Sequence, residues 1–213
     1  MMKHRVIPLE SYPRREHFDY FRAMANPYVG VTMEVEITSF LSACRERELP
    51  FFLSFVYCVG RAANAVPQLR QRIWKDGIIE FERCDTSHTV LCPDETYGYC
   101  RLNCMQPFES YLPDARRLHE RAKTEPSMDD GEDGLSLLFL SSLPWLHYTS
   151  LTQPTPSPAD SNPRITWGGY AAQGGRVTLP VTLLANHALV DGLHMAAFYR
   201  ALDQELRALC AKR

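Results

Sequence analysis

The most informative segment of the chain is Leu183-Leu184-Ala185-Asn186-His187-Ala188-Leu189-Val190-Asp191-Gly192. Its apolar beginning continues a run from Arg176, which predicts a buried strand over residues 176–185. From Gly192 onward apolar side chains recur at helical spacing, which predicts a helix over residues 192–209. His187 therefore follows a strand end, where a rigid scaffold can hold a side chain at the rim of a cleft, as a general base requires.

A purely structural interpretation of this segment is also open. His187 could close the strand and Asp191 could cap the helix, and a pattern as short as His-x-x-x-Asp-Gly also occurs by chance. In favour of chemistry, histidine is the side chain whose ordinary pKa lies nearest neutrality. The residues alone leave the two interpretations evenly balanced.

Outward from this segment, periodicity predicts a mixture of helices and strands. An Asp-Gly pair at 76–77 predicts a hairpin over residues 73–81. Strands and helices that mix without strict alternation favour an α/β (α+β) two-layer sandwich, in which helices cover a mixed β-sheet. The predicted helices span 14–24, 51–65 and 108–122, with another that Thr38 caps, and the further predicted strands span 28–37, 87–92 and 135–141.

Length and composition limit the number of domains and the classes of partner. The 213 residues are 45% hydrophobic and 23% charged, which suits a single domain over residues 1–213. A Pro-rich segment at 152–163 could be a linker, but too little chain follows it for a second core, so we expect a long loop. The net charge of −2 gives no polybasic field, and the apolar run at 51–60 is too short for a membrane helix. We therefore expect neither a nucleic-acid nor a membrane partner.

The cysteines and the acidic residues indicate the compartment and the metal content. The seven cysteines cannot all pair and lack the C-x-x-C spacing of zinc sites, so we expect free thiols in a reducing cytoplasm. No apolar stretch long enough for a signal peptide follows the N-terminal residues. The acidic residues Asp129, Asp130, Glu132 and Asp133 lack the alternating ligand positions of a calcium loop, so we expect no metal.

Several short motifs together resemble one known family. His187-x-x-x-Asp191-Gly192 is similar to the signature of the coenzyme A-dependent acyltransferase superfamily. Other segments resemble its chloramphenicol acetyltransferase branch, in the family's order and close to its spacing over nearly the whole chain. These segments are Arg14-Arg15-Glu16-His17-Phe18, Lys75-Asp76-Gly77, Ser142-Leu143-Pro144-Trp145 and Ile165-Thr166-Trp167-Gly168-Gly169-Tyr170.

The resemblance implies a catalytic apparatus. His187 corresponds to the family's general base, which takes a proton from a substrate hydroxyl as that hydroxyl attacks the thioester carbonyl of acetyl-CoA. Asp191 and Arg14 correspond to a structural ion pair that orients the site. Ser150 corresponds to the family's oxyanion donor, and Thr166 to a threonine that helps to hold the transition state through water. Without the resemblance, Ser150 and Thr166 would be interpreted as structural polar residues near turns.

The resemblance also implies an acceptor pocket on the N-terminal helix. The family's acceptor-contacting tyrosine falls on Phe21, which Tyr20 adjoins, and smaller residues, Ala25 and Val29, stand at further pocket positions. The loop at 152–163 is more polar than the family segment that lines the acceptor site. These departures leave the acceptor open between chloramphenicol and another small hydroxylated molecule.

Two departures from the family lie beside the implied coenzyme and base. Tyr170 resembles a family tyrosine near the coenzyme A channel, whereas Gly169 replaces a lysine often found there. The phosphates of the coenzyme must then be held from elsewhere or more weakly. Asn186 precedes the catalytic histidine where the family usually has a second histidine, and we expect it to support the site.

The function implied by the resemblance is O-acetyl transfer from acetyl-CoA, as co-substrate, to chloramphenicol or a similar small molecule, and hence antibiotic resistance. The family's assembly is a homotrimer, with each active site at a subunit boundary and His187 facing a pocket built by the neighbour. One alternative is a dihydrolipoyl-type acyltransferase, although no lipoyl domain or Pro/Ala linker precedes the core. Another is a non-catalytic homologue that binds coenzyme A or a small ligand.

Overall fold

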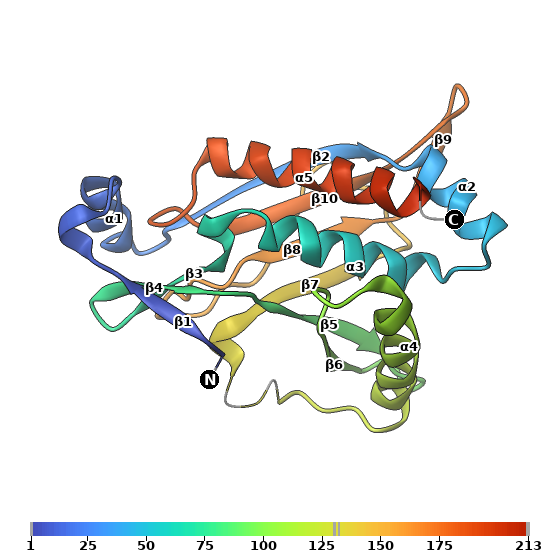
Figure 1. The fold of residues 1–213 in the computed structure, drawn as a ribbon, viewed down its shortest axis with the longest axis horizontal. Helices are drawn as coiled ribbons and strands as arrows, with labels where there is room; N and C mark the ends of the chain where they lie inside the picture. Colours follow the sequence, from blue (N-terminus) through green and yellow to red (C-terminus); the bar gives the residue numbers. More distant parts are fainter. Residues whose placement is uncertain (1, 130, 132, 212–213) are drawn as a thin grey trace.

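The computed structural model describes residues 2–129, 131 and 133–211, and within them a large mixed sheet forms the framework (Figure 1). Its strands are β2 (Tyr28–Glu36), β5 (Asp85–Leu91), β6 (Tyr97–Leu102), β7 (Leu137–Leu143), β8 (Arg164–Gly168), β9 (Ala171–Gln173) and β10 (Arg176–Asn186). The order is β2-β10-β8-β7-β5-β6, and the short β9 also pairs with β10. Strands β5, β7 and β8 run parallel to one another, whereas the other pairs are antiparallel.

A smaller sheet and five α-helices complete the described architecture. The small sheet has the order β1-β4-β3, from β1 (His4–Ile7), β3 (Gln71–Trp74) and β4 (Gly77–Phe81). The helices are α1 (Arg15–Arg22), α2 (Thr38–Glu46), α3 (Phe51–Asn64), α4 (Phe108–Thr124) and α5 (Gly192–Ala211), with 3-10 turns at Leu9–Ser11, Pro67–Arg70 and Gly134–Ser136. Among the described residues, no helix combines the length and the apolar character needed to cross a bilayer.

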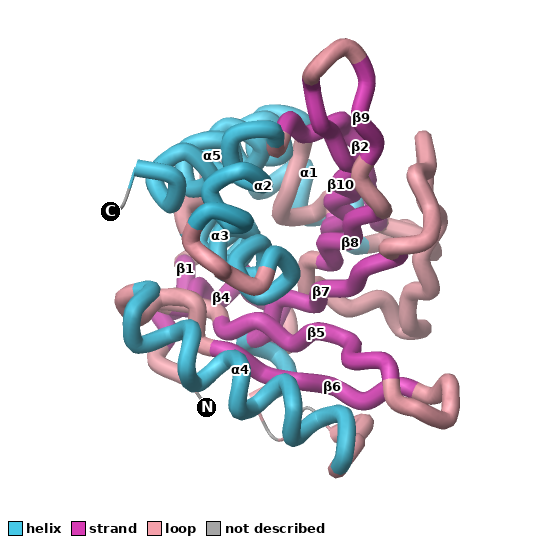
Figure 2. Tube along the Cα trace, turned by 90° about the vertical axis from the view of Figure 1, so that its right-hand side faces the viewer, coloured by secondary structure: helices cyan, strands magenta, loops and turns pink. Residues whose placement is uncertain are grey.

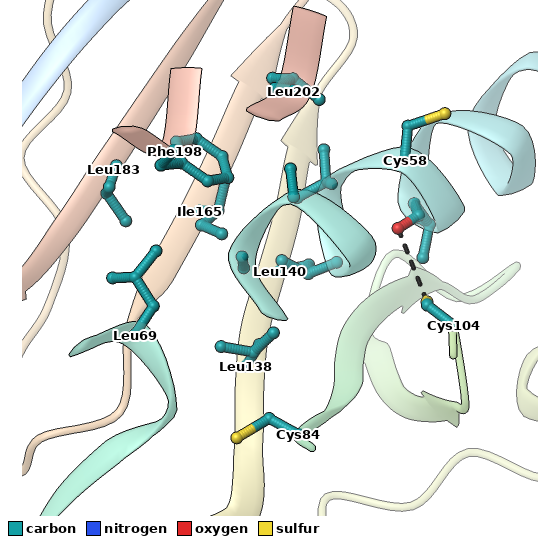
Figure 3. Close-up of a cluster of buried hydrophobic side chains, with 14 of the residues drawn as sticks. Cys58, Leu69, Cys84, Cys104, Leu138, Leu140, Ile165, Leu183, Phe198 and Leu202 are labelled. Carbon is teal, nitrogen blue, oxygen red and sulfur yellow. Dashed lines mark hydrogen bonds between the residues drawn. The ribbon is translucent and has the colours of Figure 1, made fainter. Parts of the chain in front are cut away.

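Helices α2 to α5 lie on one face of the large sheet, so the core is a helix layer packed on a sheet layer (Figure 2). Alternate side chains of β10, including Leu179, Val181 and Leu183, are fully buried beneath the helices. Figure 3 shows Leu183 and Ile165 of the sheet gathered with Phe198 of α5 in this core. The predicted two-layer sandwich with a mixed sheet is confirmed.

The opposite face of the sheet is polar along β2, β8 and β10. The hydroxyls of Thr32 and Thr182 lie 2.7 Å apart across β2 and β10. The segment 144–163, called the β7–β8 loop here, lies against this face. Tyr148 in the loop donates a hydrogen bond to the Thr166 carbonyl at 2.8 Å and accepts one from Thr182 at 3.2 Å. Residues 152–163 form no helix or strand, so the predicted long loop is confirmed. The β7–β8 loop that contains them is anchored to the sheet through Tyr148.

Some element boundaries differ from the prediction, for tertiary reasons. Thr38 does not cap α2, because the capping position is Ile37 and the Thr38 hydroxyl instead accepts a hydrogen bond from the backbone N–H of Val177 at 2.9 Å. The strand predicted from residue 135 begins at Leu137, since the preceding residues form a 3-10 turn. The sequence predicted no counterpart for four of the strands, β1, β6, β8 and β9. Pairing with neighbouring strands holds them in the sheets, so their own sequence patterns did not reveal them.

Candidate functional site

The chain reverses at His187, between β10 and α5, and the backbone fixes the imidazole. The His187 N–H donates to the Pro27 carbonyl at 2.7 Å, and Nδ1 of the ring lies 2.8 Å from the Val190 carbonyl oxygen. A carbonyl can only accept, so Nδ1 carries the ring proton and Nε2 keeps its lone pair. The imidazole is half-buried, and its Nε2 is the atom that can take up a proton.

An aromatic ring from the N-terminal helix covers one face of the imidazole. Phe21 of α1 stacks on His187, with ring centroids 3.8 Å apart and an interplanar angle of 20°. Tyr20 meets Phe21 edge-on at 5.1 Å and is 65% exposed. The structure thus brings Phe21 to the base, whereas Tyr20 points its hydroxyl-bearing ring largely into solvent. Ala25 is exposed beyond the helix, and Val29 packs at the edge of the core.

The ion pair expected from the resemblance is present beside the histidine. Arg14 Nη1 donates to Asp191 Oδ2, and Arg14 Nη2 donates to the His187 carbonyl oxygen at 3.4 Å. Asp191 Oδ1 also accepts from the backbone N–H of Leu193 at 3.0 Å. The pair therefore ties the segment before α1 to both ends of the turn that carries His187.

His194 is a neighbour of this pair that sequence reasoning missed. Its Nδ1 accepts a hydrogen bond from the Asp191 backbone N–H at 3.1 Å. Burial, and then the charge of Arg14, lower the pKa of His194, so the imidazole is neutral at pH 7. One feature of the sequence could have indicated this contact: His194 lies three residues after Asp191, on the first turn of the predicted helix.

Asn186 links the end of β10 to the β7–β8 loop. Its side-chain amide donates to the Asp160 carbonyl at 2.9 Å, and its side-chain oxygen accepts from the backbone N–H of Ala188 at 3.0 Å. Asp160 is further held by both terminal nitrogens of Arg164, each at 2.8 Å, and by the Tyr28 hydroxyl at 3.0 Å. The side chain of Asn186 is thus a structural support between the catalytic turn and the loop.

Thr166 does not meet His187 within one chain. Thr166 on β8 stands opposite Thr182 on β10, and His187 lies five residues after Thr182, just past the end of β10. At about 3.3 Å per residue, the separation along the strand is roughly 16 Å. The buried Thr166 hydroxyl donates to Gln153 at 2.8 Å, another contact that the sequence did not reveal, whereas Ser150 is exposed on the β7–β8 loop.

Tyr170 and Gly169 lie just beyond the end of β8. Tyr170 is 50% exposed and meets Phe51 of α3 edge-on, with ring centroids 5.9 Å apart. A Cβ atom at Gly169 would lie only 2.5 Å from the Pro144 carbonyl oxygen, so no side chain fits there while the β7–β8 loop keeps its place. The close approach of the loop explains why a glycine occupies this position.

No cluster of metal-ligating side chains is found within residues 2–129, 131 and 133–211. Of the acidic segment considered for calcium, Asp130 and Glu132 lie outside the described residues.

Comparison with known proteins gives relatives along the whole chain. Chloramphenicol acetyltransferase 3 of Escherichia coli is 26% identical over 207 residues, covering 95% of this chain and 97% of that protein. A chloramphenicol acetyltransferase of Streptomyces acrimycini is 27% identical over 209 residues, covering 96% of this chain and 93% of that protein. The relatives thus match nearly the whole of this chain.

Solved structures and a family model agree with these relatives. A chloramphenicol acetyltransferase superposes with a TM-score of 0.88 at 25% identity, covering 96% of this chain and all of that one. The dihydrolipoamide acetyltransferase of Azotobacter vinelandii shares the fold, with a TM-score of 0.68 at 17% identity over 91% of this chain and 88% of that one. The family model described as chloramphenicol acetyltransferase matches residues 2–203. The chain is a member of the chloramphenicol acetyltransferase family.

Proposed function

We propose that this protein transfers the acetyl group of acetyl-CoA to a hydroxyl of chloramphenicol or a similar small alcohol, and thereby confers resistance to the antibiotic. The observation that carries the proposal is the imidazole of His187, whose Nδ1 is held 2.8 Å from the Val190 carbonyl so that Nε2 is the basic atom. Membership of the family supports the acetyl donor.

In the proposed reaction His187 is the general base. Its Nε2 takes the proton of the acceptor hydroxyl as the oxygen attacks the thioester carbonyl carbon. Collapse of the tetrahedral adduct breaks the C–S bond, and the imidazolium returns the proton to the departing thiolate of coenzyme A. A base positioned in this way contributes about 10²–10⁴-fold in rate.

The oxyanion of the adduct needs donors, and we assign them to Ser150 and Thr166. The exposed Ser150 hydroxyl would donate directly. The Thr166 hydroxyl donates to Gln153 and keeps its lone pairs, so it can accept a hydrogen bond from a water that in turn donates to the adduct. Removing one such donor typically costs about 10²–10³-fold in kcat.

Such a site needs two copies of the chain. The strand register separates Thr166 from His187 by roughly 16 Å along β10. The polar face of the sheet, which the β7–β8 loop covers only in part, offers a surface for a neighbouring copy. We therefore propose a homotrimer in which His187 of one copy meets Ser150 and Thr166 of the next.

We further propose that the protein works in the cytoplasm. All seven cysteines are free thiols, and most of them are buried, which suits a reducing compartment.

The proposed function is tested by measuring, by chromatography, the coenzyme A formed from acetyl-CoA with a panel of acceptors, including chloramphenicol, other small alcohols and dihydrolipoamide. We expect kcat/KM to be highest for chloramphenicol or another alcohol. His187→Ala should lower kcat by about 10²–10⁴-fold, whereas His17→Ala on the exposed side of α1 should leave it unchanged. A preference for dihydrolipoamide would favour the thiol-accepting alternative. Ligand binding without turnover would favour a non-catalytic homologue, and full activity in His187→Ala would overturn the mechanism.

A further inference from the structure

One buried donor in the β7–β8 loop has no acceptor within the described part of the protein. The side-chain amide nitrogen of Gln153, Nε2, is buried, and among the described residues it has no hydrogen-bond partner. The oxygen of the same amide, Oε1, accepts a hydrogen bond from the Thr166 hydroxyl at 2.8 Å. A buried amide donor without an acceptor destabilises the folded state. Nε2 and Oε1 share one carbon atom, so an acceptor for Nε2 would lie close to Thr166 Oγ1.

Thr166 stands in a row of hydroxyl groups across the polar face of the large sheet. By register, Ser141 of β7 and Thr182 of β10 are its neighbours on either side. The Ser141 hydroxyl lies 3.1 Å from that of Thr89 on β5, and the Thr182 hydroxyl lies 2.7 and 3.2 Å from two further hydroxyls. The two neighbours thus pair with other groups, and the Thr166 hydroxyl is the member of the row that turns to Gln153.

The β7–β8 loop holds Thr166 at two points. Tyr148 donates to the Thr166 carbonyl at 2.8 Å, and Gln153 accepts from the Thr166 hydroxyl. Because Thr166 Oγ1 gives its proton to Gln153, its lone pairs can only accept a further hydrogen bond, whereas Gln153 Nε2 can only donate one. A group between these two atoms must therefore accept from Nε2 and donate to Oγ1, and a water molecule can do both.

We propose that Gln153 is a positioning residue of the acetyl-transfer site, which orients a water molecule on Thr166. The water accepts from Gln153 Nε2 and donates one hydrogen to Thr166 Oγ1, so its second hydrogen is left for the oxyanion of the tetrahedral adduct. With both protein bonds fixed, the water aims a donor at the place where negative charge develops, which stabilises the transition state. The inference rests on the proposed function, and it adds a residue to which the family resemblance gave no role.

The first test is a crystal structure of the protein at a resolution that shows ordered water. We expect a water oxygen about 2.7–3.2 Å from both Gln153 Nε2 and Thr166 Oγ1. The water should be lost in Gln153→Met, which keeps the length of the side chain without its amide. A protein group on Nε2, or no water between the two atoms, would overturn the inference. This measurement requires no turnover, so it stands even if the protein acetylates no alcohol.

Steady-state kinetics test the role of this water in the reaction. Gln153→Met should lower kcat about tenfold and leave the KM of acetyl-CoA and of the acceptor within about twofold, because the water bonds to the oxyanion only in the transition state. Gln153→Glu keeps an acceptor for Thr166 but replaces the amide donor with a carboxylate oxygen. The water would then donate to this oxygen, so kcat should fall further. The control, Gln204→Met at an exposed position on α5, should match the wild type.

The outcomes separate this inference from the proposed function. Acetyl transfer with a wild-type kcat in Gln153→Glu would overturn the role of Nε2 alone, as would a raised KM for the acceptor with an unchanged kcat. Thr166→Val and the double variant Thr166→Val/Gln153→Met should have the same kcat, because both residues hold one water. Losses that multiply would contradict a shared water. A water on Gln153 and Thr166 without acetyl transfer to any alcohol by the wild type would support the water site and contradict the O-acetyltransferase assignment.

Discussion

Three contacts hold His187 in one orientation: the Val190 carbonyl on Nδ1, the Phe21 ring on one face, and Arg14 on its own carbonyl. The Val190 contact comes from the turn itself, whereas Phe21 and Arg14 belong to the N-terminal segment, so the base depends on that segment as much as on its own turn. A general base gains its effect only while it is held in productive geometry. The guanidinium of Arg14, which also holds Asp191, is the link between the two segments.

Replacing Arg14 with Ala should both destabilise the fold and reduce activity. Asp191 Oδ2 and the His187 carbonyl would lose the donors that Arg14 supplies, so we expect the free energy of unfolding to fall by about 2 kcal/mol and kcat to fall with it. Arg14→Lys should be intermediate, because an ammonium cannot reproduce the fork geometry. The control is Arg15→Ala, whose exposed pair with Asp19 is weak. Denaturant unfolding and steady-state kinetics check the prediction, and wild-type values in Arg14→Ala would contradict it.

His88 should make the stability depend on pH. Burial, and then the neighbouring His119, lower its pKa from 6.5 to about 3 in the folded protein. The unfolded chain takes up a proton at His88 as pH falls below about 6.5 and the folded protein does not, so the stability due to neutral His88 is present above pH 6.5 and is lost as pH falls. Between pH 7 and pH 5 this loss is about 2 kcal/mol.

The measurement is denaturant unfolding at pH 7 and pH 5. His88→Phe, which places an apolar ring beside Phe52 and Trp167, should lose about 2 kcal/mol less than the wild type over this interval. A variant at the exposed His17, His17→Gln, should follow the wild type. An equally steep pH dependence in His88→Phe would show that His88 is not the group responsible.

At the scale of elements, the β7–β8 loop is held by the strand that carries the base. Asn186 binds the Asp160 carbonyl, and Tyr148 bonds to the Thr166 carbonyl and the Thr182 hydroxyl. The loop also approaches so closely that no side chain fits at Gly169. The resemblance assigns part of this loop to the acceptor pocket, and it places Gly169 and Tyr170 near the coenzyme A channel. Both parts of the proposed site therefore depend on the position of this one loop.

Asn186→Ala should loosen the loop and leave the imidazole chemistry in place. We expect faster hydrogen exchange at residues 152–162 and a KM for the acceptor raised roughly three- to tenfold, with a smaller change in kcat. Asn103→Ala, which removes an exposed side-chain bond to Met105, is the matched control. Unchanged exchange and KM in Asn186→Ala would assign the loop's anchoring to Arg164 and Tyr28.

For the whole molecule, the decisive feature is that Thr166, one of the proposed oxyanion donors, lies well away from the base along the sheet. Thr166 stands beside Thr182, whereas His187 lies beyond the end of β10. A cyclic assembly would bring His187 of one copy to the oxyanion donors of the next at each boundary. The assembly would then be a condition of activity.

Mixing two inactive variants tests this arrangement. His187→Ala and Ser150→Ala, each deficient alone, are unfolded together and refolded as a mixture. In a randomly mixed trimer, a boundary with an intact His187 from one copy and an intact Ser150 from the next arises with a probability of roughly one quarter. We expect about that fraction of wild-type kcat, alongside a trimer mass by light scattering. No recovery on mixing, or full activity in a monomer, would place the whole site within one chain.

The sequence by itself determined the local units of this protein: a strand that ends just before His187, a helix that begins at Gly192, and the strand β2, which the alternation over residues 28–37 predicted. These follow from nearest neighbours and periodicity, which need no knowledge of distant segments. The pairing of Arg14 with Asp191 came only from the family resemblance, since the residues are far apart in the sequence.

Only the tertiary structure decided how distant segments align. The register of β8 on β10 separates Thr166 from His187, the close passage of the β7–β8 loop excludes a side chain at Gly169, and the packing of α4 on the sheet brings His119 to 3.1 Å from His88. A shift of one residue in a strand reverses every side chain, and no local pattern fixes the partner's register. The physical reason is that such contacts depend on how the whole core packs.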